Sequence, residues 1–177
     1  MQAPTGVQLT DRTGVFIALI QPLLQPAFAL AMAMLGDRPA AEDAVQEAAL
    51  KAWRSAWKVA GSSSPPESWF LTIVANQCRD TRRTRWWRVL RLAEMPEIRQ
   101  SDHAERVTAL LDLDRAMARL SREQRALVYL RYHLDMQPKE ISAVLSLREG
   151  TVKSRLHRAL RRLQAELTPG SKEETDD

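Results

Sequence analysis

The sequence predicts an all-α protein made of two small helical domains joined by a flexible linker, the C-terminal domain containing a helix-turn-helix. Apolar residues recur at three- and four-residue spacing along most of the chain, and no segment shows the period of two that indicates a strand. The largely polar segment 92–105 contains a proline and divides the chain. Residues 138–163 then have the pattern of two short helices around a tight turn.

Four parts are expected along the 177 residues: an N-terminal domain over 1–91, a linker over 92–105, a second domain over 106–168 and an acidic tail over 169–177. An apolar content of 45% is ordinary for a soluble chain that buries modest cores. The net charge is only +4, but arginines cluster over 79–91 and again over 148–162. Two separate basic stretches indicate two contacts with one polyanion.

The first helical segment, residues 15–35, is apolar enough to be considered as a membrane span. It is interrupted by Gln21, Pro22, Gln25 and Pro26, and no basic stretch precedes it. We therefore expect no stable membrane insertion and interpret the segment as core helix, kinked near its two prolines.

Gly36 and Asp37 form a helix stop followed by an N-cap, and the next helix is expected over 39–57. Its buried stripe is predicted to consist of Ala41, Val45, Ala48, Ala49, Ala52 and Trp53. The opposite side holds Asp43, Glu47, Leu50 and Arg54, with Gln46 at its edge. An exposed leucine among acidic residues is typical of a docking surface, whereas periodicity alone favours an ordinary solvated face.

Residues 61–66, with the sequence GSSSPP, are expected to form a polar loop before a helix that runs from 67 to about 85. The packed side of this helix is predicted to hold Trp69, Phe70, Ile73, Val74 and Gln77. A second face carries Asn76, Asp80 and Arg83. Beyond it, Trp86 and Trp87 adjoin Arg88 and Arg91, a mixture that suits stacking on unpaired bases and equally suits a small aromatic core.

The second half is expected to begin with a helix over 106–120, after which Ser121 caps the next helix. Glu123 and Gln124 lie close to the capping-box position. The core under the helix-turn-helix is predicted to consist of Leu127, Val128, Leu130 and Leu134.

The helix-turn-helix begins at Pro138, and its first helix places Ile141, Val144 and Leu145 on one buried face. After a turn at 146–149, the apolar positions of the second helix are Val152, Leu156, Ala159, Leu160 and Leu163. A helix that reads base edges in a major groove needs hydrogen-bonding side chains with cations around them. The expected base contacts are Lys153, Ser154, His157 and Arg158, and the expected phosphate contacts are Arg148, Arg155, Arg161 and Arg162. DNA binding is the leading prediction, and a merely well-charged surface helix is the alternative.

Cys78 is the only cysteine, so neither an internal disulfide nor a cysteine-based metal site can form. Its apolar neighbours favour a buried structural thiol over a redox sensor. The sequence has no glycine-rich phosphate loop, no His and carboxylate set with metal spacing and no Ser or Cys nucleophile motif. We therefore expect no catalytic residue, metal or cofactor, and a cytoplasmic protein.

Three sequence motifs follow one another along the chain: GDRPAAEDAVQEAALKAWR, SWFLTIVANQCRDTRR and LSREQRALVYLRYHLDMQPKEISAVLSLREGTVKSRLHRALRRL. In this order, with a linker between the second and the third, the chain resembles the extracytoplasmic-function (ECF) sigma factors, small two-domain promoter-recognition subunits of bacterial RNA polymerase. The resemblance covers nearly the whole chain. It implies promoter-specific transcription initiation with core RNA polymerase and promoter DNA as partners, and an anti-sigma factor as a further partner.

The resemblance also implies roles for individual residues. The clamp of the largest polymerase subunit would bind Asp43, Gln46, Glu47 and Leu50, with the polymerase flap as a second contact. The minus ten element would be recognised and melted by the loop residues Ser62, Ser63 and Ser64 together with Asn76, Asp80 and Arg83. Capture of an unstacked base would shift duplex toward open DNA. The minus thirty-five element would be read by Arg148, Thr151, Lys153, Ser154, Arg155, His157 and Arg158.

Two other classes of protein remain open at this stage. A free-standing helix-turn-helix regulator would bind duplex DNA without polymerase, but it gives no role to the face around Leu50 or to the basic and aromatic stretch 79–91. A nuclease or hydrolase acting on nucleic acid would need a catalytic constellation, whereas the three histidines, His103, His133 and His157, are scattered over the expected linker, core helix and recognition helix.

Overall fold

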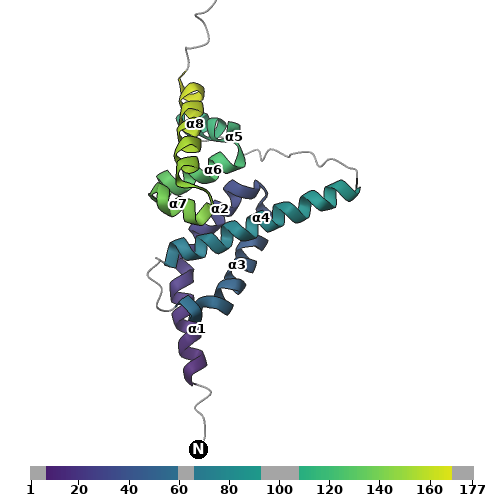
Figure 1. The fold of residues 1–177 in the computed structure, drawn as a ribbon, viewed down its shortest axis with the longest axis vertical. Coiled ribbons are helices and arrows are strands. Elements are labelled where there is room, and N and C mark those ends of the chain that lie inside the picture. Colours follow the sequence, from purple (N-terminus) through teal and green to yellow (C-terminus); the bar gives the residue numbers. More distant parts are fainter. Residues whose placement is uncertain (1–6, 60–65, 93–107, 169–177) are drawn as a thin grey trace, which may run out of the picture.

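The computed structural model describes residues 7–59, 66–92 and 108–168, and within these ranges every regular element is helical. The elements are α1 (Val7–Ile20), the 3-10 turn η1 (Gln21–Leu23), α2 (Leu24–Leu35), α3 (Arg38–Val59), α4 (Pro66–Leu92), α5 (Thr108–Arg119), α6 (Arg122–Val128), the π-helical turn η2 (Tyr129–His133), α7 (Pro138–Leu145) and α8 (Glu149–Leu167). Figure 1 shows α1 to α4 in one part of the molecule and α5 to α8 stacked on it. The predicted all-α class is confirmed, with α7 and α8 as the helix-turn-helix.

The N-terminal helical segment bends where the sequence places its prolines. Pro22 lies in η1 and Pro26 in the first turn of α2, where a missing N–H breaks no helical hydrogen bond. The core prediction is confirmed for α2, whose buried residues are Ala27, Leu30, Ala31, Met34 and Leu35. It is wrong for α1, in which Val15 is 65% and Ile17 54% exposed, because this helix extends past the bundle (Figure 1). By length and composition alone, Thr13–Leu35 could cross a membrane.

Gly36 and Asp37 separate α2 from α3 as their residue types predict. Gly36 adopts a left-handed conformation with φ of 66°, and its N–H donates to the Met32 carbonyl at 2.8 Å. Asp37 then caps α3, its Oδ2 accepting from the Ala40 N–H at 3.1 Å. These two residues turn the chain so that α3 can pack back against α2.

The core of the first half is built on small residues of α3. Ala41, Ala44, Ala48 and Ala52 are buried and let α3 approach α2 and α4 closely. The inclusion of Trp53 in the buried stripe is wrong, because its side chain is 39% exposed. It lies at the edge of the stripe, where its ring meets that of Phe16 edge-on at 5.0 Å between centroids.

Helix α4 begins at Pro66, a residue well suited to a first helical position, and continues to Leu92, past the predicted end near residue 85. Neither glycine nor proline occurs between them after the first residue, so nothing local stops the helix. Its buried side chains include Phe70, Leu71 and Val74. The C-terminal part of α4 projects out of the bundle (Figure 1).

The second half begins with α5, where the sequence predicts a helix, and α6 then starts at the predicted cap. Ser121 and Gln124 form a reciprocal capping box, with the Gln124 N–H donating to Ser121 Oγ at 3.2 Å and the Ser121 N–H to Gln124 Oε1 at 3.0 Å. The predicted core is confirmed, with Leu127, Val128, Leu130, Ile141, Val144, Leu145, Val152, Leu156, Ala159 and Leu163 buried and Leu134 partly buried. Leu160 is an exception at 38% exposed, because it lies at the edge of the apolar stripe of α8.

The main apolar core spans both halves, while a smaller cluster that includes Ala116, Leu120 and Leu163 lies within the second half. A single buried cluster contains Leu30, Phe70 and Val74 from the first half and Leu127 and Ile141 from the second. Two hydrogen bonds cross the seam between the halves: Tyr129 Oη donates to the Pro26 carbonyl at 3.2 Å, and Arg79 Nη2 to the Val144 carbonyl at 3.3 Å. Burial, with a further contribution from the Glu67 charge, raises the pKa of Tyr129. The seam therefore positions α4 directly against α7.

We expect Gly36→Ala to lower the free energy of unfolding by about 1 to 2 kcal/mol, because an L side chain in the left-handed conformation clashes with its own backbone. The added Cβ would also lie 3.4 Å from Arg122 Nε. Chemical denaturation measures the change.

Gly14→Ala is the matched control for this substitution. Gly14 lies inside α1, and a Cβ added there would meet nothing within 4 Å. The helical alanine should raise stability by roughly 0.5 to 1 kcal/mol. A destabilisation of equal size in both variants would contradict the proposed role of the Gly36 conformation.

Candidate nucleic-acid interface

Helix α8 has the geometry of a recognition helix. One face is buried through Val152, Leu156 and Ala159, while the four expected base-contacting residues, Lys153, Ser154, His157 and Arg158, are all exposed on the other. The helix follows a tight turn in which Ser146 has a left-handed φ of 50°, and the Leu147 N–H returns to the Ser142 carbonyl at 3.0 Å. The turn thus fixes the angle at which α8 leaves α7.

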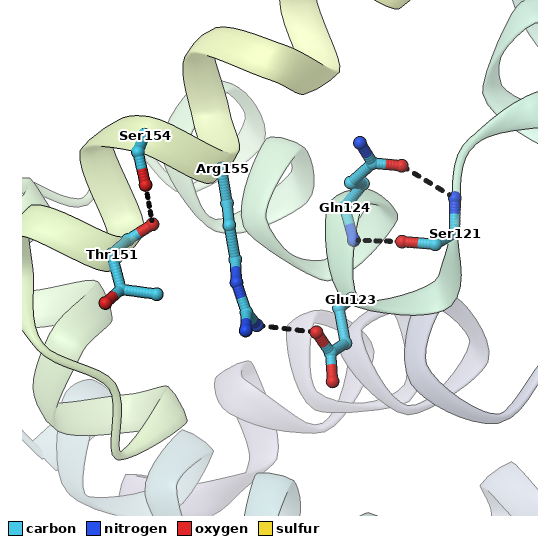
Figure 2. A network of polar contacts seen from close by, with 6 residues as sticks. All are labelled: Ser121, Glu123, Gln124, Thr151, Ser154 and Arg155. Carbon is cyan, nitrogen blue, oxygen red and sulfur yellow. Dashed lines mark hydrogen bonds and ion pairs between the residues drawn. The ribbon is translucent and has the colours of Figure 1, made fainter.

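Local contacts orient the polar side chains of α8. Ser154 Oγ donates to the Thr151 carbonyl at 3.1 Å (Figure 2), and Arg158 Nε donates to the Ser154 carbonyl at 3.3 Å. Lys153 Nζ lies 2.6 Å from the Glu149 carboxylate, and this hydrogen bond lowers the pKa of Glu149. The contact of Lys153 with Glu149 and that of Arg158 with the Ser154 carbonyl are both exposed. Such contacts are weak, so either side chain could exchange its contact for one with DNA.

The remaining residues of the expected minus thirty-five set differ in accessibility. Arg148 is exposed at the N-cap of α8, and Thr151 is partly buried in its first turn. Arg155 points from α8 toward α6, where its Nη1 donates to Glu123 Oε2 at 2.5 Å (Figure 2). This ion pair joins the two helices, so Arg155 has a structural partner that the sequence did not indicate.

The acidic face of α3 is open to solvent. Asp43, Gln46, Glu47 and Leu50 are all exposed, and the Leu50 side chain is 51% accessible. About half of Leu50 is thus accessible next to two carboxylates and an amide. The structure thus brings the four predicted docking residues together on one helical face.

The second face of α4 also has the predicted composition. Asn76, Asp80 and Arg83 are exposed, with Arg83 Nη2 at 3.4 Å from Asp80 Oδ1. The Asn76 Oδ1 accepts a hydrogen bond from Arg79, which also holds the Val144 carbonyl across the seam. Ser62, Ser63 and Ser64 lie outside the described residues, as do the side chains of Trp86 and Trp87.

Cys78 is buried on the opposite side of α4, and burial raises the pKa of its thiol to about 12. The thiol therefore stays protonated and packs as a small apolar group, as the sequence analysis favoured. No cluster of three or more His, Cys, Asp or Glu that could hold a metal occurs in the part of the chain that the structure describes.

The sequence did not reveal the seam between the halves. Arg79 belongs to a basic stretch that the sequence singled out, but its contact with Val144 joins residues far apart in the chain. No local pattern could have indicated this pairing, because it depends on how the two halves pack.

The comparisons with known proteins agree with this arrangement. The model of sigma-70 region 2 matches residues 19–88, and that of sigma-70 region 4 matches residues 110–163. A two-region sigma factor of the sigma-70 type is therefore the class that the fold and its surfaces define.

Two relatives and one solved structure make the class more specific. The chain is 34% identical over 141 residues to the ECF RNA polymerase sigma factor SigL of Mycobacterium tuberculosis, which covers 77% of this chain and 80% of that protein. It is 42% identical over 90 residues to the RNA polymerase sigma-E factor of Streptomyces antibioticus, with 48% of this chain and 50% of that one covered. The sigma factor RpoE of Bartonella quintana, solved in complex with the anti-sigma factor NepR, superimposes with a TM-score of 0.72 at 27% identity over 84% of this chain and 93% of that one.

This chain belongs to the extracytoplasmic-function sigma factors. The family resemblance read from the sequence is confirmed. Sigma factors are transcription initiation factors rather than enzymes. Membership of this family favours a role in transcription initiation over the free-standing regulator and the nuclease considered above.

Proposed function

We propose that this chain binds core RNA polymerase in the cytoplasm and directs it to specific promoters. The first domain, over 1–91, would dock on the polymerase and recognise and melt the minus ten element. A linker over 92–105 would lead to a second domain, over 106–168, that reads the minus thirty-five element. The observation that carries the proposal is the exposure of all three predicted contact faces, on α3, α4 and α8, in a chain that matches both sigma regions in order.

The α3 face is the proposed contact with the polymerase clamp. Its carboxylates at Asp43 and Glu47 offer electrostatic steering toward a basic partner surface, and Leu50 offers an apolar anchor among them. Exposed leucines are common on protein surfaces, but here sigma-factor membership gives this one a role. A contact of the second domain with the polymerase flap completes the proposed complex.

The α4 face is the proposed contact with the melted minus ten strand. The Asn76 amide can pair with a base edge that duplex DNA hides, and Arg83 offers a further polar contact. Ser62, Ser63 and Ser64, which precede α4 in the sequence, are the other proposed contacts. Binding that is available only to an unstacked base shifts the equilibrium from closed to open DNA. No covalent reaction is needed for this opening of the DNA.

The α8 face is the proposed reader of the minus thirty-five element. Its N-terminal turns expose Lys153, Ser154, His157 and Arg158, and Arg148 is placed beside the positive end of the helix dipole, where phosphates bind well. Arg155 is paired with Glu123 through Nη1, so a phosphate contact would use its other guanidinium donors.

An anti-sigma factor is a further proposed partner. The neighbouring RpoE structure was solved with one, and it aligns over 84% of this chain. A protein inhibitor that covers α3 or α8 would compete directly with the proposed polymerase or promoter contact.

Glu47→Arg should abolish comigration with sigma-free bacterial core polymerase on gel filtration, because it reverses a charge at the centre of the proposed docking face. Glu166→Arg makes the same charge change on the far end of α8 and should comigrate normally. Retained binding by the Glu47 variant would remove the α3 face from the proposal.

Arg158→Ala should reduce discrimination at one base pair of the upstream element by about tenfold, since a bidentate contact to a base contributes roughly 1 to 3 kcal/mol. Holoenzyme binding to promoters selected from a random library, measured for all single-base changes, gives the profile. Arg161→Ala is the control and should weaken binding to all sequences alike. A uniform loss for Arg158→Ala as well would assign it to phosphate alone.

Asn76→Ala should slow promoter opening much more than it weakens closed-complex binding, because its proposed partner is exposed only after melting. Permanganate footprinting on duplex and on pre-melted template separates the two steps, with Thr84→Ala on the same helix as the control. Equal defects on both templates would contradict a melting role.

A further inference from the structure

The two basic stretches of the sequence meet at the seam between the halves. A cavity of about 90 Å³ opens there, between α4 on one side and α6 and α8 on the other. Its charged lining consists of Arg79 and Arg82 from α4, Arg122 and Glu123 from α6, and Arg155 from α8. The other walls are apolar side chains of α2, α6 and α7 and of the segment that joins α7 to α8. We refer to this site as the arginine cleft.

The arginine cleft has an excess of positive charge. Glu123 is its one carboxylate, and it is paired with Arg155 at 2.5 Å. Among the described residues, Arg79 donates to two neutral oxygens, those of Asn76 and Val144. Within the described residues neither Arg82 nor Arg122 has an ion-pair partner, so three of the four guanidinium groups have no carboxylate beside them.

The surroundings of Arg122 increase this excess. Arg125, one turn further along α6, has a lowered pKa, caused first by burial and then by the positive charge of Arg122. Its Nε is buried without a hydrogen-bond partner. Arg122 itself lies beside Gly36 at the end of α2, so the positive charge of this residue of the second half is held against the first half.

Like charges from both halves are therefore brought together when the seam forms. Arg79 and Arg82 belong to the first half, and Arg122 and Arg155 to the second. Their repulsion opposes closure. An anion between them would replace that repulsion with attraction to both sides.

We propose that the arginine cleft binds an oxyanion of the phosphate class, which bridges the two halves and stabilises their closed arrangement. Planar guanidinium groups match phosphate oxygens in paired hydrogen bonds. A cavity needs about 10 to 15 Å³ of this kind of volume to hold one water molecule. The volume of about 90 Å³ therefore leaves room for one phosphate group.

Isothermal titration calorimetry of the full chain with sodium phosphate, at ionic strength matched with sodium chloride, tests binding. We expect saturable binding of one anion per chain. The double variant Arg82→Gln and Arg122→Gln should bind at least about tenfold more weakly, since each removes a charge-assisted contact. Arg119→Gln with Lys139→Gln removes two exposed cations outside the cleft and should bind as the unmodified chain does.

A lysine variant at the same two positions guards against a folding defect. Arg82→Lys with Arg122→Lys keeps the charge but loses the paired geometry. Its affinity for phosphate should therefore fall between that of the unmodified chain and that of the glutamine variant. Titration with adenosine triphosphate in parallel distinguishes the source of the phosphate. If adenosine triphosphate binds more tightly than inorganic phosphate, and the glutamine variant loses this binding, the site is assigned to a phosphate ester. If inorganic phosphate binds more tightly, the site is assigned to the free ion.

The distance between the halves provides a second readout. Spin labels on Thr84→Cys in α4 and Gln164→Cys in α8 report it, because both positions are exposed and Cys78 is buried. Phosphate should narrow the distance distribution in the unmodified cleft and not in the glutamine variant. Absence of saturation, or equal weakening in the Arg119 and Lys139 control, would overturn the proposal. Neither measurement involves polymerase, so their outcome is independent of the proposed function.

Discussion

The apolar seam between α2 and α4 on one side and α6 and α7 on the other is the contact on which the rest of the structure depends. It joins the halves into one buried cluster that includes Phe70, Val74, Leu127 and Ile141. Burying such side chains contributes roughly 1.5 to 3 kcal/mol each, far more than the single hydrogen bonds from Tyr129 or Arg79 that border the seam. The apolar contacts therefore hold together two halves whose arginines repel each other.

The same seam limits what the closed chain can do under the proposed function. The nominal positions of the two promoter elements differ by about 25 base pairs, or about 85 Å of duplex at about 3.4 Å per base pair. In the closed arrangement Arg79 of α4 touches Val144 of α7 at 3.3 Å. Halves packed against each other in this way cannot reach two elements that far apart at once, so the proposed promoter binding would require the halves to separate. An anion in the arginine cleft would oppose this separation, which links the two proposals through one equilibrium.

Much of the local structure and of the candidate interface could be predicted from the sequence because its signals are local. Gly36, Asp37 and Ser121 set helix ends through backbone conformation and capping, and these need only neighbouring residues. The exposed faces of α3, α4 and α8 follow from helical periodicity in the same way. Errors arose where burial depends on distant neighbours, as for Trp53 and Leu160 at stripe edges and for α1, which extends beyond its partners.

The sequence by itself determined the helical class, the turns between helices and the residue types on each contact face, because hydrophobic period and capping chemistry act over a few residues. Only the tertiary structure decided that the halves share a core, that Arg155 pairs with Glu123 and that four arginines converge on one cleft. These contacts join segments separated by tens of residues. Their geometry depends on how whole helices pack, and no short window of sequence encodes that packing.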